Sequence, residues 1–138
     1  MNKHSPKKIR YAVVGLGHIA QTAVLPAFKH SANSELVALV SDDPKKLKTL
    51  GEKYKVPTDA HFSYYDYPGC LEEANVNAVY ICLPNHMHSE YTIEALENKV
   101  HVLCEKPLAT SIEECDEIAA ASRDHGVHCM TAYRMHFE

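Results

Sequence analysis

The chain carries an acid, a base and a proline in succession, Glu105, Lys106 and Pro107, directly after the apolar run Val100–Cys104. A lysine at the end of a buried strand can hydrogen-bond a substrate hydroxyl and stabilise the alkoxide that develops as a hydride leaves. Glu105 can orient neighbouring groups, and Pro107 stiffens the turn and can adopt a cis peptide bond. Taken alone, the triplet is better explained as a charged turn with a solvated lysine. Its interpretation therefore depends on what else lies at the same edge of the sheet.

A glycine motif follows the first apolar run, Ile9–Val14, and reads G-x-G-x-x-A from Gly15 to Ala20. Gly15 allows a tight turn, Gly17 has no side chain to block a pyrophosphate, and Ala20 lets a helix pack close to the sheet. The N-terminus of that helix then directs its free N–H groups at the phosphates. The motif alone is weak, but its place between a strand and a helix meets the structural requirement for a dinucleotide loop. Such a loop favours a catalytic Lys106 over a solvated one, because both segments leave the sheet at the same edge.

The residues after the second apolar run, Leu36–Val40, bear on the choice between the two nicotinamide cofactors. A carboxylate at this place holds the ribose 2′-hydroxyl of NAD, whereas a small polar residue with a nearby cation accepts the 2′-phosphate of NADP. If the strand ends with this run, Ser41 and Lys46 can hold a phosphate. If the strand is one residue longer, Asp42 takes the ribose position. The sequence leaves both readings open, and we favour NADP.

The loop after the run Ala78–Leu83 contains Pro84, which fixes the turn, and two histidines. His86 and His88 form an H-x-H pair, which is a known arrangement of zinc ligands. No further cluster of Cys, Asp and Glu with ligand spacing accompanies the pair. We therefore interpret the histidines as residues of a cofactor loop and a helix start, and we predict no metal site.

Six apolar runs predict strands of a parallel sheet, because they are nearly continuous rather than alternating, as in strands covered on both faces. They are Ile9–Val14, Leu36–Val40, Pro57–Phe62, Ala78–Leu83, Val100–Cys104 and Val127–Ala132. Helical segments lie between them, so the order predicts right-handed βαβ units. We expect one doubly wound α/β domain over residues 1–138, a six-stranded Rossmann sheet with helices on both faces.

Capping residues predict where the helices begin and end. We expect N-caps at Asp43 and Asn85, a capping box at 111–114 and a C′ glycine at Gly126. Pro26 is expected to end or kink the first helix near Leu25. The stripe predicted to be buried on the last helix consists of Ile112, Cys115, Ile118 and Ala119.

The composition limits the classes of partner. The net charge is −4 and the basic residues are dispersed, whereas nucleic-acid binding needs a concentrated basic face. No apolar run approaches the roughly 20 residues that cross a bilayer, and the N-terminus lacks the apolar part of a secretory signal. The five cysteines form an odd set without C-x-x-C spacing. We expect a cytoplasmic protein that binds neither nucleic acid nor membrane, with Cys82 and Cys104 acting as small apolar groups.

Three segments together resemble a known family. They are GLGHIA at 15–20, PNHMHSE at 84–90 and HVLCEKPLA at 101–109. These segments are similar to those of the Gfo/Idh/MocA family, which includes glucose-fructose oxidoreductase and inositol dehydrogenase. The similarity extends from Ile9 to the AYRMHFE end of the chain. It implies an NAD(P)-dependent oxidoreductase that transfers hydride between nicotinamide and a sugar, a polyol or a related hydroxy or carbonyl compound.

The resemblance also implies roles for individual residues. Lys106 matches the family's active-site lysine. The implied cofactor contacts are Gly15, Leu16, Gly17, His18, Ile19, Ser41, Lys46, Leu83, Pro84, Asn85, His88, Glu105 and Arg134. The family's usual acid after the second strand is replaced by Ser41, which puts a preference for NAD in doubt.

The family has a second domain, an open antiparallel sheet that supplies substrate contacts and usually the catalytic His or Asp. We expect that domain to be absent from these 138 residues, and we expect a homo-oligomer where it is present. The alternative hypothesis is a stand-alone dinucleotide-binding or sensing module without catalysis.

Overall fold

The chain forms a parallel six-stranded sheet in a computed structural model that describes residues 7–133 and 135. The strands are β1 (Ile9–Val14), β2 (Ser34–Val40), β3 (His61–Phe62), β4 (Ala78–Ile81), β5 (His101–Glu105) and β6 (Cys129–Ala132). Their order in the sheet is β3-β2-β1-β4-β5-β6, and every neighbouring pair is parallel. This order is that of the doubly wound dinucleotide-binding fold, which confirms the predicted fold class.

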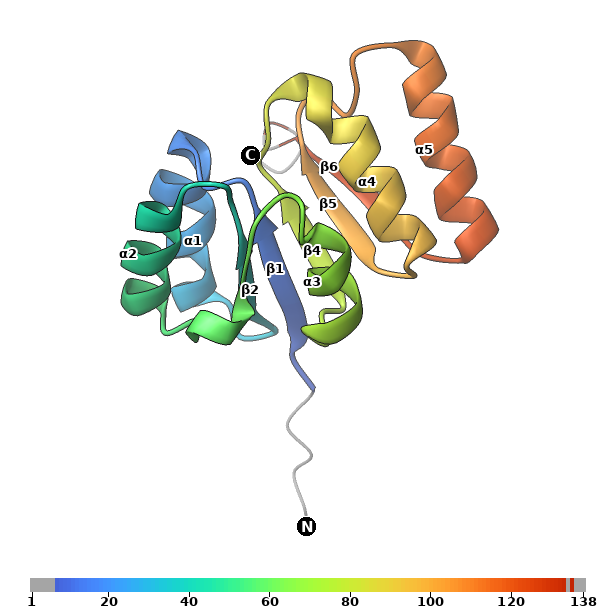
Figure 1. The fold of residues 1–138 in the computed structure, drawn as a ribbon. Helices are drawn as coiled ribbons and strands as arrows, with labels where there is room; N and C mark the ends of the chain where they lie inside the picture. The colour runs from blue at the N-terminus through green and yellow to red at the C-terminus, as the bar shows by residue number, and fades with distance from the viewer. Residues whose placement is uncertain (1–6, 134, 136–138) are drawn as a thin grey trace.

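Helices connect the strands and cover both faces of the sheet (Figure 1). The longer ones are α2 (Pro44–Tyr54), α3 (Tyr67–Glu73), α4 (His88–Glu97) and α5 (Ile112–His125). A composite helix follows β1 and consists of the π-helix η1 (Ala20–Val24), α1 (Leu25–Ala27) and the 3-10 helix η2 (Phe28–His30). Two further 3-10 turns are η3 (Thr58–Ala60) and η4 (Asn85–Met87).

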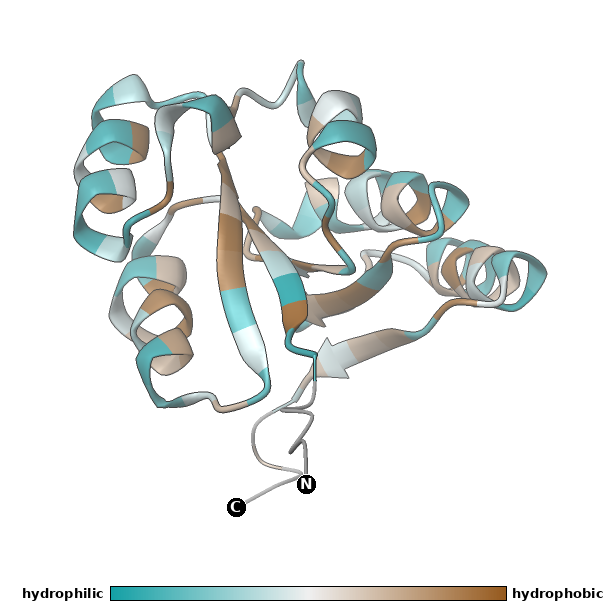
Figure 2. Cartoon of the chain, turned by 90° about the horizontal axis from the view of Figure 1, so that it is seen from below, coloured by the Kyte–Doolittle hydropathy of each residue, from teal (hydrophilic) through white to brown (hydrophobic). Residues whose placement is uncertain are grey.

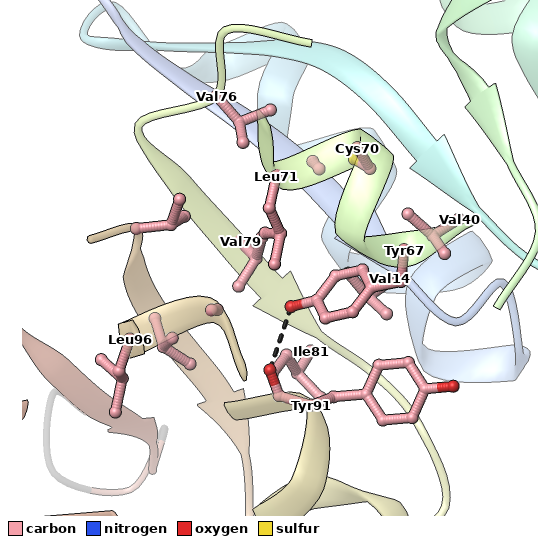
Figure 3. Packing of buried hydrophobic residues seen from close by; sticks show 14 of the residues in the cluster. Val14, Val40, Tyr67, Cys70, Leu71, Val76, Val79, Ile81, Tyr91 and Leu96 are labelled. Carbon is pink, nitrogen blue, oxygen red and sulfur yellow. Dashed lines mark hydrogen bonds between the residues drawn. The ribbon is translucent and has the colours of Figure 1, made fainter. Parts of the chain in front are cut away.

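Two apolar clusters form the core, one on each face of the sheet. The larger cluster packs α3, α4 and α5 against β1, β2, β4 and β5. Its largest fully buried side chain, Tyr67, donates a hydrogen bond of 3.0 Å to the Tyr91 carbonyl (Figure 3). The smaller cluster packs η1, α1 and α2 against Val13 and Leu39 of the two central strands. Figure 2 shows the apolar residues concentrated in the strands and on the inner sides of the helices.

The smaller cluster does not extend over β5 and β6. Side chains on this part of the sheet are partly exposed, including Leu103 of β5 and Met130 of β6, which is 48% exposed. Tyr11, Leu103 and Met130 line a shallow depression there with Ile9 of β1. The expectation of helices on both faces is therefore correct for β1 and β2, whereas the described helices cover one face of β5.

Most capping predictions are confirmed. The Asp43 carboxylate accepts hydrogen bonds from the N–H groups of Lys45 and Lys46, and the Ser111 hydroxyl accepts one from Glu114. Gly126 has a left-handed φ of 66° at the end of α5. The Asn85 prediction is wrong, because residues 85–87 form the 3-10 turn η4 and Met87, without a side-chain bond, precedes α4.

Two helix predictions need correction. Of the two outcomes expected at Pro26, an end of the helix is wrong, because helical structure continues to His30. The helix instead changes type near Leu25, where the preceding turn is a π-helix and the Leu25 N–H bonds to the Ala20 carbonyl. A π-turn shifts the hydrogen-bond register at the point where proline lacks a donor. Ile112 is 77% exposed rather than buried, whereas Ile118 is 1% exposed as predicted.

Candidate dinucleotide site

The turn after β1 is built around Gly15, which has a φ of +90°. Its N–H donates to the Val40 carbonyl at 2.9 Å, which ties the turn to the end of β2. A Cβ at this position would lie 2.9 Å from the Cys82 carbonyl oxygen. Backbone conformation and space therefore both require glycine here.

Gly17 lies in a different environment, because a Cβ there would meet no protein atom within 4 Å. Helical structure begins at His18 and Ile19, and the Gly17 carbonyl accepts from the Gln21 N–H at 3.1 Å. The first N–H groups of a helix have no partners within it, and here they belong to the same turn as the open position at Gly17. Ala20 is fully buried against the sheet, as the spacing predicts. The loop therefore offers free donors beside a space that no side chain fills.

The loop after β2 is held by its own polar side chains. β2 ends at Val40, so Ser41 is the first residue after the strand. Ser41 is 5% exposed, and its hydroxyl accepts from the Asp43 N–H at 3.1 Å. The Asp42 carboxylate accepts from the Tyr64 N–H at 2.7 Å, which joins this loop to the segment after β3.

Charges near this loop are exposed. The Lys46 Nζ lies 4.0 Å from the Asp43 carboxylate, and both side chains are nearly half exposed, so the pair contributes little to stability. Burial raises the pKa of the Tyr64 phenol, the Asp42 carboxylate raises it further, and a hydrogen bond with Ser41 lowers it. Tyr64 therefore stays protonated at neutral pH and presents a neutral hydroxyl beside Ser41.

The loop after β4 begins at the centre of the sheet. The Cys82 N–H donates to the Val14 carbonyl at 2.8 Å, and Leu83 is 5% exposed. Pro84 and Asn85 are exposed beyond it. His88, which begins α4, is 1% exposed and both of its ring nitrogens contact backbone carbonyls, so no ring nitrogen faces the open edge.

The segment after β5 contains the predicted catalytic residue. Lys106 is exposed, and its ammonium makes no ion pair within residues 7–133. The Lys106–Pro107 peptide bond is cis, as the sequence reading allowed. Glu105 accepts a 2.9 Å hydrogen bond from the Tyr80 hydroxyl, and both side chains line a groove of ≈ 310 Å³ against the composite helix.

The buried thiols are poor nucleophiles. Burial raises the pKa of Cys70 and of Cys104 to about 12 and that of Cys129 to about 11, so these thiols are protonated at neutral pH. Cys82 and Cys104 are 8% and 0% exposed, consistent with the predicted apolar role. Within the described part of the chain, no group of three or more His, Cys, Asp or Glu side chains is arranged to hold a metal ion.

The structure brings together most of the predicted cofactor residues. The segments 15–19, 41–46 and 83–88 follow β1, β2 and β4, and Glu105 and Lys106 lie at the end of β5. The carboxyl ends of these four strands share one edge of the sheet (Figure 1). Arg134 lies outside the described residues. The sequence reading missed Tyr64 and Tyr80. Tyr80 pairs with Leu103 in the sheet, so strand alternation could have placed it on the face of Glu105.

Strand order, glycine turn and open helix N-terminus together define a Rossmann dinucleotide-binding domain. A family model described as "Oxidoreductase family, NAD-binding Rossmann fold" (Gfo/Idh/MocA) matches residues 9–133. The chain belongs to the Gfo/Idh/MocA family, and it is an NAD(P)-binding domain of that family. No helix among the described residues is long and apolar enough to cross a membrane.

Known relatives are similar over nearly the whole chain. D-xylose 1-dehydrogenase (NADP(+)) 2 of Haloferax volcanii is 32% identical, over 92% of this chain and 38% of its own. The structure of aldose-aldose oxidoreductase from Caulobacter crescentus, complexed with glycerol, is 37% identical with a TM-score of 0.91, over 96% of this chain and 39% of that one.

A third relative is the 3-ketoreductase KijD10 of Actinomadura kijaniata, in complex with TDP-benzene and NADP. It is 30% identical with a TM-score of 0.87, over 96% of this chain and 40% of that one. The chain thus spans about a third of the length of its curated relatives, 32% to 38% for the first three.

Proposed function

We propose that the chain binds NADP(H) across the carboxyl ends of β1, β2, β4 and β5. The open space at Gly17 carries this proposal, because a glycine that no neighbouring atom requires is explained by a ligand that approaches the backbone. Gly15, Leu16, Gly17, His18 and Ile19 would hold the pyrophosphate, mainly through backbone N–H groups. Leu83, Pro84, Asn85, Glu105 and Arg134 would form the nicotinamide half, and His88 would lie beneath it, with both ring nitrogens against backbone carbonyls.

A preference for NADP over NAD rests on the loop after β2. Ser41 directly follows the strand, and Lys46 supplies a cation in the first turn of α2. The Asp42 carboxylate is engaged by the Tyr64 N–H, so it is less available to a ribose hydroxyl. Two of the relatives carry NADP in their descriptions, the xylose dehydrogenase and KijD10.

Lys106 is proposed to assist hydride transfer to or from a sugar, a polyol or a related hydroxy or carbonyl compound. Bound nicotinamide accepts or supplies the hydride. The Lys106 ammonium, exposed at the same sheet edge, would hydrogen-bond the substrate oxygen and stabilise the negative charge that develops there. Of the three relatives named above, two are sugar oxidoreductases by description, and KijD10 is described as a 3-ketoreductase. Substrate-binding groups and a homo-oligomer interface would belong to a second domain outside these 138 residues.

A titration of this chain with NADPH and with NADH tests the cofactor proposal. We expect both cofactors to bind and NADPH to bind about tenfold more tightly. One hydrogen bond between a charged side chain and the 2′-phosphate contributes roughly 1.5 kcal/mol. The matched variant Ser41→Asp should reverse the order, because its carboxylate repels the 2′-phosphate. Equal affinities in both proteins would contradict the NADP preference, and binding of neither would contradict the site.

Turnover of the protein at its full natural length tests the role of Lys106. In a panel of aldoses and polyols with NADP⁺, we expect Lys106→Ala to lower kcat by about 10²- to 10³-fold, as for loss of one charge-stabilising donor. Lys45→Ala removes another exposed lysine, on α2, and should leave kcat unchanged. Unchanged kcat in Lys106→Ala would contradict the catalytic role. Cofactor binding without turnover on any substrate would favour the non-catalytic sensing module.

A further inference from the structure

His88 joins two loops of the proposed site through both nitrogens of its ring. Its Nδ1 lies 2.6 Å from the Pro107 carbonyl oxygen, and its Nε2 lies 2.8 Å from the Leu83 carbonyl oxygen. The residue is 1% exposed, so water does not replace either contact. Pro107 and Leu83 are 24 residues apart in sequence and follow adjacent strands, β5 and β4.

The chemistry of the two partners determines what the ring must do. A carbonyl oxygen only accepts hydrogen bonds, and a neutral imidazole carries a single N–H donor. A neutral ring would leave one carbonyl facing a nitrogen lone pair at less than 3 Å. The tautomer decides which nitrogen donates, so the ring donates to one carbonyl and packs in contact with the other.

The contact at Pro107 fixes the backbone beside the proposed catalytic residue. Lys106 lies between Glu105, which is paired with Ala132 in the sheet, and Pro107, whose carbonyl His88 holds. Both ends of the Lys106 backbone are therefore anchored, although its side chain is exposed. The other ring nitrogen anchors this arrangement to Leu83, which borders the same sheet edge.

We propose that His88 is a positioning residue, which sets the place of the Lys106 ammonium by joining the Pro107 and Leu83 carbonyls. The inference rests on the proposed function of Lys106 and assigns His88 a role through the backbone rather than through its own contact with the cofactor. A small displacement of a catalytic group is costly, because about 1 Å can reduce a rate by around 10²-fold.

The first experiment measures backbone hydrogen exchange in this chain without cofactor. His88→Phe keeps a ring of similar size and removes both ring nitrogens. We expect the amides of Lys106 and Leu108 to exchange about tenfold faster in this variant, because the Pro107 and Leu83 carbonyls lose the ring nitrogens that contact them. His88→Gln retains donors on its amide nitrogen and should recover part of the protection.

Tyr67→Phe is the matched control, since it also removes a buried side-chain bond to a carbonyl, that of Tyr91, in the core. It should leave exchange at Lys106 and Leu108 unchanged. Unchanged exchange at these two amides in His88→Phe would overturn the proposal. So would an acceleration of equal size at Val13 in β1, because that would show a general loss of stability.

The second experiment measures turnover of the natural full-length protein in a double-mutant cycle. We expect His88→Phe to lower kcat at least tenfold while changing the KM for NADP⁺ by less than about twofold, since the glycine loop is untouched. In the Lys106→Ala background, His88→Phe should have no further effect on kcat, whereas Tyr67→Phe should act equally in both backgrounds.

The outcomes separate the two proposals. Additive effects of His88→Phe and Lys106→Ala would overturn the positioning role while leaving the catalytic role of Lys106 intact. An unchanged kcat in Lys106→Ala alone would instead remove the proposed function. In that case the exchange experiment still decides whether His88 holds the Lys106 backbone.

Discussion

At the scale of single residues, Gly15 and Gly17 show how two glycines of one motif serve different purposes. Gly15→Ala places a Cβ against the Cys82 carbonyl at a φ of +90°, so we expect a loss of about 2 kcal/mol in unfolding free energy. Gly17→Val meets no protein atom near its Cβ, so stability should change by less than about 0.5 kcal/mol while NADPH affinity falls at least tenfold. Urea unfolding and a NADPH titration of both variants measure the contrast.

Equal destabilisation by the two substitutions would contradict this division of roles. The motif itself was predictable from the sequence, because two glycines at this spacing between a strand and a helix are typical of a dinucleotide loop. The sequence does not predict why each position needs a glycine, because that depends on whether neighbouring chain segments leave space for a Cβ atom. That information comes from Cys82 and Leu83, which lie more than 60 residues away in sequence.

The thiols give a second prediction at this scale. Burial raises the pKa of Cys70 and Cys104 to about 12, so at pH 8 the reactive thiolate form of either is scarce. We expect iodoacetamide at pH 8 to modify the partly exposed Cys115 of the native chain and to spare Cys70 and Cys104. Mass spectrometry of digested protein locates the label. Labelling of all three at equal rates in the native state, as expected in urea, would contradict the buried positions.

At the scale of elements, local signals predicted helix ends better than helix interiors. Asp43, Ser111 and Gly126 act at the positions expected because caps depend on a few neighbouring backbone groups. Helix propensities do not predict the π-turn before Pro26. The helix stays intact across the proline because Ala20, Val24 and Leu25 pack against the sheet, which is a tertiary interaction. Ile112 fits the apolar period of α5 but lies in its first turn, beyond the edge of the core.

The start of α5 provides a prediction on pH. Hydrogen bonds from the Thr110 N–H and hydroxyl lower the pKa of the Glu114 carboxyl. A carboxyl with a lowered folded-state pKa stabilises the fold above its unfolded pKa, near 4.5, and this contribution is lost as the pH falls through the folded value. We expect the stability difference between the original chain and Glu114→Gln to be present at pH 6 and to disappear by about pH 3.

Urea unfolding at intervals between pH 6 and pH 3 measures this difference. Ser111→Ala is the matched control, because it removes an uncharged cap of the same turn and should cost about 1 kcal/mol at every pH. A stability difference for Glu114→Gln that persists unchanged at pH 3 would show that the carboxylate contributes nothing through its charge.

At the scale of the whole molecule, the strand order brings the four site loops to one edge, and the sheet has unequal coverage. Apolar runs predicted the strands and their parallel direction, since each alternates with a helix. The run Pro57–Phe62 is the exception in length, because residues 58–60 form the 3-10 turn η3 and only His61–Phe62 form β3. They did not reveal that the side of β5 carrying Leu103 is left without a described helix. An apolar run shows that a strand is largely buried, but it does not show what covers each of its two faces. Composition therefore cannot distinguish a strand with helices on both faces from one with helices on a single face.

The position of the site at the strand-order reversal leads to a prediction on the stability of the entire domain. A dinucleotide that contacts loops from β1, β2, β4 and β5 touches both halves of the sheet, so it should bind only the folded chain. At free NADPH near 100 times Kd, mass action then adds about 2.7 kcal/mol to the unfolding free energy. For a domain of this size, that corresponds to a rise of about 8 °C in Tm.

Calorimetric melts at increasing NADPH measure this rise. Gly17→Val is the control, because without NADPH it should unfold at the original Tm, and with an affinity lowered at least tenfold its Tm should rise by at most about half as much. Lys106→Ala should still respond fully, since its ammonium is assigned to the substrate oxygen rather than to cofactor affinity. A single unfolding transition whose Tm rises with NADPH would show that the two halves of the sheet unfold together and that the ligand stabilises both. Two transitions, with only one shifted by NADPH, would instead place the dinucleotide on one half of the sheet and contradict a site that spans the reversal.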